Sequence, residues 1–236
     1  MLRALTLDFW GTLYTGVSGR QQRLGLLDQA LRQAGCPRTW EQLEGAYEHA
    51  WQAFEQVWRQ ENRPFSVAEW LGEMLTFLEA ELPEEVRHGL YRPLEEALLE
   101  CPPRPVPGVL EVLPRLARRF RLGIVSDVGL TPGRVLREFL QRDGLLPHFQ
   151  ALTFSDEAGR TKPRPEVFWR TLEALGARPE EAAHIGDLPE TDLAGARKAG
   201  MRAILFLGVS RREDGREWAD AVFTDYGELE GVLEGM

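Results

Sequence analysis

The spacing of apolar residues divides the chain into a helical region and a region in which strands alternate with helices. Between about residues 20 and 100, apolar side chains recur every three or four positions, which is typical of helices with one buried face. Four such stripes are present, at residues 24–31, 43–58, 67–78 and 86–98. Ser66 and Glu69 form a capping-box motif at the start of the third stripe. We therefore expect a bundle of four amphipathic helices.

A proline-rich segment, CPPRPVPG at residues 101–108, ends the helical region and predicts a stiff connection. Beyond it, short apolar segments predict strands at residues 121–126, 149–154, 182–187, 201–206 and 221–224. The segments between them predict helices at residues 108–119, 132–143, 165–176 and 190–199. For the second of these helices we expect Thr131 as the N-cap and Pro132 at the first helical position.

This alternation predicts a parallel sheet with helices on both faces. An apolar strand at residues 5–8 (LTLD) resembles the later strands more than the helices that follow it. The chain is therefore expected to begin one α/β domain, leave it for a helical insert, and return to complete it.

Composition and charge narrow the kind of protein. The hydrophobic and charged fractions, 43% and 28%, are ordinary for a globular protein, and no apolar run is long enough to span a membrane. A net charge of −9 gives no general attraction for nucleic acid or an anionic membrane. Cys36 and Cys101 have no metal-ligand spacing. With no signal peptide expected at the start, we expect a cytoplasmic monomer or homodimer acting on a small molecule.

Candidate chemistry collects where the expected strands end, and these ends meet at one edge of a parallel sheet. The residues concerned are Asp8, Ser126, Asp127, Asp187 and Asp192, together with Lys162 in the loop GRTKPRP. Paired carboxylates suit Mg²⁺, which prefers oxygen ligands. An ammonium and a hydroxyl suit phosphoryl oxygens, and an aspartate can attack phosphorus. Lys162 is one of only two lysines, beside Lys198, in a chain rich in arginine, which favours a role for its compact charge.

Four segments, DFWGTL, IVSD, TKPRPEVF and HIGDLPETDLAGARKAGM, resemble in order the four motifs of the haloacid dehalogenase-like hydrolases. The resemblance covers nearly the whole chain. It implies a Rossmann-like catalytic core formed by residues 1–15 and 103–236. The residues between, 16–102, are similar to the helical cap of that superfamily.

The resemblance also implies residue roles. Asp8 would be the nucleophile, with Thr12 and Ser126 as donors to the phosphate and Lys162 as the group that neutralises its charge. The turn residues Trp10 and Gly11 would contact the substrate.

A Mg²⁺ ion would be held by Asp8, Asp187 and the main-chain oxygen of Trp10. Asp192 would support or orient this metal site. The expected activity is therefore a Mg²⁺-dependent phosphatase that forms an aspartyl-phosphate intermediate.

Trp10 departs from the pattern of the phosphatases, which carry a second aspartate there as general acid and base. An indole has no titratable proton, and general acid–base catalysis contributes about 10²–10⁴-fold. Substrates with good leaving groups would be affected least. Asp127 is a candidate replacement; the alternative is that it caps the following helix.

Two alternatives follow from Trp10. Haloacid dehalogenases of this superfamily also carry an aromatic residue there, which favours a metal-independent 2-haloacid dehalogenase. Against it, those enzymes usually have Asn where Asp187 stands and Tyr where Phe168 stands. The second alternative is a protein that binds a phosphorylated ligand with little turnover.

Four of the seven tryptophans fall in the helical insert, at positions 40, 51, 58 and 70. Their helical spacing predicts core packing. A second interpretation is an apolar wall that covers the site and excludes water. His184, within an expected strand, is predicted to be a core residue with satisfied hydrogen bonds.

Overall fold

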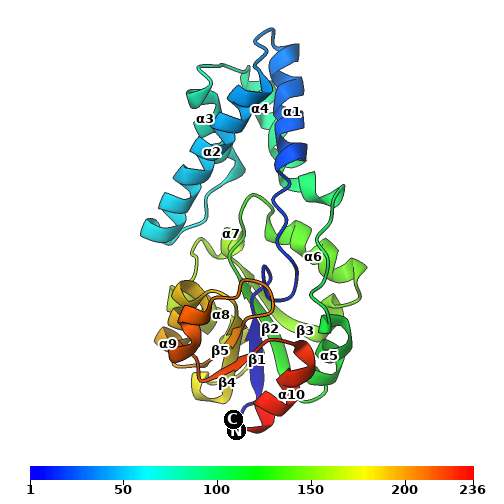
Figure 1. The fold of residues 1–236 in the computed structure, drawn as a ribbon, viewed down its shortest axis with the longest axis vertical. Coiled ribbons are helices and arrows are strands. Elements are labelled where there is room, and N and C mark those ends of the chain that lie inside the picture. The colour runs from blue at the N-terminus through cyan, green and yellow to red at the C-terminus, as the bar shows by residue number, and fades with distance from the viewer.

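A six-stranded parallel sheet occupies the centre of the larger part of the molecule (Figure 1). The computed structural model describes all residues, 1–236. The strands are β1 (Ala4–Leu7), β2 (Arg121–Ser126), β3 (Phe149–Phe154), β4 (Ala182–Gly186), β5 (Arg202–Phe206) and β6 (Ala221–Phe223). Their order in the sheet is β3-β2-β1-β4-β5-β6. The predicted parallel α/β core is confirmed. The sequence could predict it because strands that are buried on both faces appear as continuous apolar runs.

Helices cover both faces of this sheet. One hydrophobic cluster joins it to α5 (Val109–Leu116), α6 (Gly133–Arg142) and α10 (Tyr226–Glu234). A second cluster joins it to α8 (Pro165–Leu175) and α9 (Ala194–Ala199). Short helical segments complete the core: α7 (Ser155–Ala158), the 3₁₀ turns Leu146–His148, Pro179–Glu181 and Glu213–Trp218, and the π turn Pro189–Leu193.

The predicted start of α6 was wrong. The helix begins at Gly133, Pro132 is the N-cap, and Thr131 lies outside it. The hydroxyl of Thr131 accepts a hydrogen bond from Nη2 of Arg23 at 2.8 Å, and the first N–H of the helix is bound by Asp156 at 3.1 Å. Capping is therefore supplied by Asp156 of the short helix α7 (Ser155–Ala158), which frees Thr131 to bind the helical insert.

The insert contains the four predicted helices. They are α1 (Arg20–Gln33), α2 (Trp40–Gln56), α3 (Val67–Phe77) and α4 (Glu84–Glu96), with a π turn at Val57–Glu61 and a 3₁₀ turn at Ala97–Leu99. The capping box of Ser66 and Glu69 is present, and both of its hydrogen bonds form. The helices enclose a core of their own, to which the rest of the chain adds one buried residue, Leu130. We call this insert the cap.

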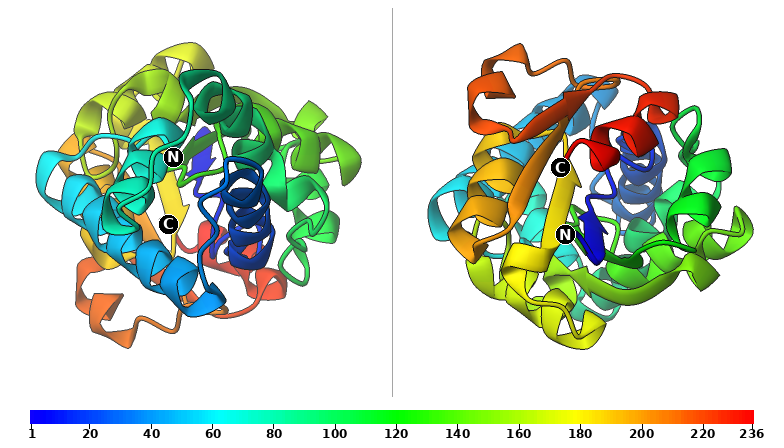
Figure 2. Two further views of the ribbon diagram at one scale, coloured as in Figure 1. Left: turned by 90° about the horizontal axis from the view of Figure 1, so that it is seen from above. Right: turned by 90° about the horizontal axis from the view of Figure 1, so that it is seen from below.

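Two chain segments join the cap to the core and lie side by side. Thr15 N–H donates to the Arg104 carbonyl and Val106 N–H to the Leu13 carbonyl, both at 2.9 Å. We propose to place the division here, with residues 16–102 as the cap. The cap helices lie over the edge of the sheet where the strands end, and both termini lie at the opposite end of the core (Figures 1 and 2). None of the helices combines the length and apolar character that crossing a membrane requires.

Candidate active site

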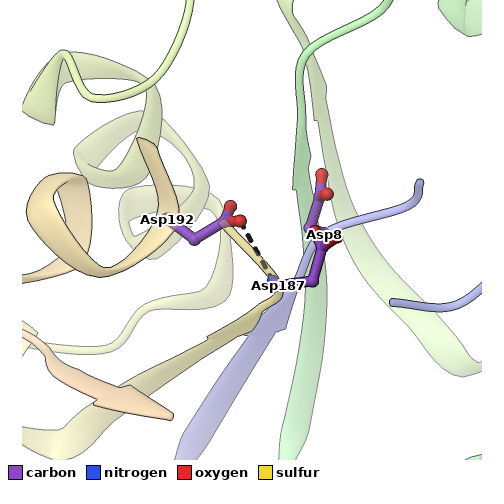
Figure 3. Close-up of side chains that lie close together, drawn as sticks. All are labelled: Asp8, Asp187 and Asp192. Atoms are coloured by element: carbon purple, nitrogen blue, oxygen red, sulfur yellow. Dashed lines mark hydrogen bonds between the residues drawn. The ribbon is translucent and has the colours of Figure 1, made fainter. Parts of the chain in front are cut away.

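Asp8 and Asp187 directly follow the two central strands, β1 and β4. The strand order reverses between β1 and β4, and crevices at such switch points bind the ligands of open α/β sheets. Leu7 is in register with Ile185, and Asp8 N–H donates to the Ile185 carbonyl at 2.9 Å. The two carboxylates are thus brought side by side beyond the strand ends (Figure 3).

A tight loop after β1 leaves room for this pair. Gly11 has φ +72° and its N–H donates to the Tyr14 carbonyl at 2.8 Å. The rings of Phe9 and Tyr14 stack at 4.5 Å and hold the two ends of the loop together. A Cβ atom at Gly11 would lie 2.2 Å from Oδ2 of Asp187. Only glycine satisfies both the left-handed backbone and the close approach of that carboxylate.

Lys162 lies between two carboxylates in the interior. Its Nζ is 2.7 Å from Oδ1 of Asp8 and 2.6 Å from Oδ1 of Asp192, and its side chain is 3% exposed. Burial by itself lowers the pKa of this ammonium, but Asp192 and Asp8 outweigh burial and raise the pKa above its ordinary value. Lys162 therefore stays charged throughout the physiological range.

Asp192 has both oxygens occupied by donors from the protein. Oδ1 receives Lys162 and contacts Nε2 of His184 at 3.1 Å, while Oδ2 accepts the N–H groups of Asp187 and Leu188 at 3.2 and 2.9 Å (Figure 3). Burial opposes ionisation, but the pKa of Asp192 is lowered because Lys162 and His184 favour the charged form. Its oxygens position its neighbours and the turn after β4.

The prediction for His184 is confirmed. The side chain is fully buried, and Nδ1 lies 2.8 Å from Oγ1 of Thr6, so both ring nitrogens have partners. The Phe168 ring packs edge-on against the imidazole at 4.9 Å. Phe168 therefore belongs to the hydrophobic core.

Asp187, in contrast, is incompletely satisfied. Its Oδ1 atom is buried and has no hydrogen-bond partner. The pKa of this carboxyl is raised to about 8, mainly by burial and in addition by the charges of Asp192 and Asp8. Oxygen atoms from Asp8, Asp187 and Asp192 lie within 4.8 Å of one another, with Lys162 as the single adjacent cation. A buried cluster with excess negative charge, an orphaned oxygen and only oxygen donors fits a hard divalent cation.

Asp127 follows β2 and connects three parts of the molecule. Its Oδ1 accepts the Lys162 N–H at 2.9 Å, and its Oδ2 accepts Nε1–H of the cap residue Trp58 at 2.8 Å. Burial raises the pKa of Asp127 to about 7, although Lys162 and Trp58 favour its ionised form. Asp127 does not cap the following helix, so that interpretation was wrong.

A cavity of about 430 Å³ opens between core and cap. Six of the predicted site residues line it: Asp8, Trp10, Gly11, Asp127, Lys162 and Asp187. Thr12, Ser126 and Asp192 are buried and do not line it. The Thr12 hydroxyl is also buried without a hydrogen-bond partner.

The tryptophans of the cap divide between the two predicted roles. Trp70 is fully buried in the core of the cap, and Trp40 is 42% exposed. Trp51 and Trp58 are half-buried and line the cavity. Phe54 and Arg23 line it as well, and the sequence did not predict this. The helical stripe marked Phe54 only as a core residue, and Arg23 does not stand out in a chain rich in arginine.

Fold and site together define an α/β enzyme whose polar centre lies between a parallel core and a helical cap. Residues 2–200 match the model of the haloacid dehalogenase-like hydrolases. The chain belongs to this family, as the motifs predicted, and it is a hydrolase.

Several curated relatives are similar to the chain. A glyceraldehyde 3-phosphate phosphatase of Methanothermobacter thermautotrophicus is 31% identical over 209 residues, 87% of this chain and 85% of that protein. A phosphoserine phosphatase of Thermus thermophilus is 42% identical over 98 residues, 42% of this chain and 39% of that protein. A glyceraldehyde 3-phosphate phosphatase of Pyrococcus furiosus is 33% identical over 137 residues, 56% of this chain and 55% of that protein. The chain thus spans about half or less of the length of the last two.

Solved structures share the fold along the whole chain. A 2-haloacid dehalogenase from Pseudomonas syringae superposes with a TM-score of 0.74 at 24% identity, covering 100% of this chain and 99% of that one. A phosphatase of the same family from Thermococcus onnurineus superposes with a TM-score of 0.68 at 24% identity, covering 99% of each chain. Because both activities occur on this fold, the fold alone does not choose between them.

Proposed function

We propose that the protein is a Mg²⁺-dependent phosphatase of small phosphorylated metabolites, with Asp8 as the nucleophile. The observation that carries this proposal is the presence of Asp8, Lys162 and the unpartnered Asp187 carboxylate at the floor of one cavity. The names of the three curated relatives, all phosphatases, support it.

The residues that would hold Mg²⁺ are Asp8, Asp187 and the main-chain oxygen of Trp10. Asp192 would support the site indirectly, because its oxygens already receive four donors. When bound, Mg²⁺ would screen the charge of the phosphoryl group against the carboxylates.

The reaction proceeds in two displacements. An Asp8 carboxylate oxygen attacks phosphorus, the O–P bond to Asp8 forms, and the bond to the leaving oxygen breaks with its electron pair. Lys162, which lines the cavity, stabilises the phosphoryl oxygens. Water then attacks phosphorus and loses a proton, the bond to Asp8 breaks, and inorganic phosphate departs.

Asp127 is the candidate proton carrier, in place of the second aspartate that phosphatases of this family carry at the position of Trp10. It lines the same cavity as Asp8, and its pKa of about 7 suits both donation and acceptance near neutral pH. Trp10 contributes an apolar surface, with its ring edge-on to Phe9 at 4.9 Å.

The test is hydrolysis of 4-nitrophenyl phosphate and acetyl phosphate, with Mg²⁺ and with EDTA. We expect metal-dependent release of phosphate that Asp8→Asn abolishes. Turnover by the wild type no faster than by Asp8→Asn would reject the phosphatase for activated substrates and leave a dehalogenase or a protein that binds its ligand with little turnover.

A 2-haloacid dehalogenase is the second candidate, and Trp10 is the observation that favours it. Chloride release from 2-chloropropionate in the presence of EDTA would support this alternative. The unpartnered Asp187 argues against it, because a free carboxylate repels a carboxylate substrate unless a cation neutralises it.

A further inference from the structure

The cavity has a polar floor and an aromatic roof. Its roof is formed by Trp51, Phe54 and Trp58, which follow one another along α2 and the π turn. The rings of Trp51 and Phe54 are 4.9 Å apart at 27°, and those of Phe54 and Trp58 are 6.2 Å apart at 17°. These near-parallel rings form a continuous apolar surface above the carboxylates.

These side chains do more than fill the core of the cap. Trp51 and Trp58 are only partly buried and pack at the edge of the cap's hydrophobic cluster, whereas Trp70 is fully enclosed in it. Val128 and Leu130, from the loop after β2, add apolar surface to the same cavity. A half-buried aromatic surface facing an open cavity is a suitable contact for a flat apolar group.

Two side chains of the cap that line this cavity, Arg23 and Trp58, already have partners for their nitrogen donors. Arg23 lines the cavity, but its Nε donates to the Leu94 carbonyl at 3.0 Å, its Nη2 to Thr131, and its Nη1 to the Ser18 carbonyl. Nε1 of Trp58 donates to Asp127. Neither Arg23 nor Trp58 therefore has a spare nitrogen donor for a sugar or another polyhydroxylated group, and the contact area that α2 adds to the cavity consists mainly of ring surfaces.

We propose that the substrates are aryl phosphates, the phosphate monoesters of phenols, whose ring lies against Trp51 and Phe54 while the phosphate reaches Asp8. This proposal rests on the proposed phosphatase function and specifies its substrate class. The leaving group of an aryl phosphate also suits the residue at position 10. A phenol, with a pKa of about 10 as in tyrosine, leaves with less help from an acid than an alcohol does, and Trp10 provides no acid.

An aryl phosphate would react by the same two displacements at phosphorus. The bond from Asp8 to phosphorus forms, the bond from phosphorus to the aryl oxygen breaks, and the phenoxide leaves with the electron pair. It takes a proton from Asp127 or from water. Water then releases phosphate and restores Asp8.

The experiment compares phenyl phosphate with acetyl phosphate, which is activated but has no ring. In Trp51→Leu we expect the ratio of kcat/KM for phenyl to acetyl phosphate to fall about tenfold, mainly through KM. Trp51→Phe should recover most of the ratio. Trp40→Leu is the matched control, because Trp40 lies on the same helix, is exposed and does not line the cavity; it should leave the ratio unchanged.

Binding provides a second readout that does not require turnover. Phenylphosphonate should bind about tenfold more tightly than methylphosphonate in calorimetry, and Trp51→Leu should remove the difference. An unchanged phenyl-to-acetyl ratio in folded Trp51→Leu, or equal affinity for the two phosphonates, would overturn the aryl proposal. Failure of the phosphatase function would be distinct, since acetyl phosphate would then not be hydrolysed even by the wild type.

Discussion

The core and the cap face the same cavity with opposite chemistry. On the core side, Asp8, Lys162 and Asp192 hold one another within 2.6–2.7 Å and are almost completely buried. On the cap side, Trp51 and Phe54 contribute ring surfaces without a shared hydrogen bond.

This difference shows how the two parts divide the work. Polar groups that must act at a fixed geometry are placed on strand ends, where the sheet determines their separation. Apolar contacts tolerate small displacements, so they can be carried by a separate helical unit. Trp58 and Arg23 of the cap reach across to Asp127 and Thr131 of the core. If chemistry and selectivity separate along this division, substitutions in the core should change turnover and substitutions in the cap should change substrate preference.

The largest expected effect is in the core. Asp8→Asn removes the nucleophile and should lower kcat for 4-nitrophenyl phosphate by more than about 10⁴-fold, while the cap continues to bind phenylphosphonate. Steady-state kinetics and calorimetry on the same sample check both statements. Retention of more than a hundredth of the wild-type rate would remove Asp8 from the role of nucleophile.

Lys162→Met should destabilise the core. The substitution leaves the buried carboxylates of Asp8 and Asp192 without their ammonium partner. Removing one partner of a buried ion pair lowers the free energy of unfolding by about 3–5 kcal/mol. Lys198→Met, at the other lysine of the chain, is exposed and is the matched control. Denaturant titration should show a loss only in the first variant. Equal stability of the two would mean that the buried cluster is held together without Lys162.

Much of the core followed from the sequence. Strand ends such as Ser126 and Phe154 were placed correctly, because uninterrupted apolar runs mark strands buried on both faces. Asp8, Asp187 and Lys162 were expected at one site because parallel strands end at one edge, and the structure brings them together. These features depend on local pattern and on a general property of parallel sheets.

The contacts between cap and core did not follow from the sequence. Trp58 and Asp127 are 69 positions apart, and Arg23 and Thr131 are 108 apart. Their meeting depends on how the cap is placed over the strand ends, which periodicity within each element does not encode. The same limitation produced the wrong N-cap, since the partner of Thr131 comes from the cap.

Asp127 should give the reaction its pH dependence. With a pKa of about 7, it is protonated below neutral pH and can donate to a leaving alcohol. At saturating Mg²⁺, kcat for an alkyl phosphate should therefore fall as the pH rises through about 7. Asp127→Asn should flatten this limb and reduce the rate at pH 6 by about 10²-fold, with a smaller loss for acetyl phosphate.

The stability of the protein provides an independent readout of the same group. The pKa of Asp127 is raised from about 3.9 in the unfolded chain to about 7 in the folded one, so the folded state binds more protons between these values. Its contribution to stability is present below pH 4 and is lost as the pH rises through about 7. Denaturant titrations at pH 5 and pH 8 measure how far the free energy of unfolding declines between these two values. In Asp127→Asn this decline should be smaller than in the wild type. A decline identical to that of the wild type would show that Asp127 ionises normally.

The smallest expected effect concerns the hydrogen bond between the two regions. Trp58→Phe keeps an aromatic ring in the roof but removes the Nε1–H that donates to Asp127 at 2.8 Å. Because this donor favours the ionised carboxylate, its loss should raise the pKa of Asp127 and move the falling limb of the pH–rate profile to higher pH. The ratio of kcat/KM for phenyl to acetyl phosphate should change less than about threefold, since the stacking surface of Trp51 and Phe54 remains.

A shift in the pH–rate profile with constant selectivity would show that the cap tunes the core through one hydrogen bond. A change in selectivity with an unmoved profile would instead limit Trp58 to its apolar contact.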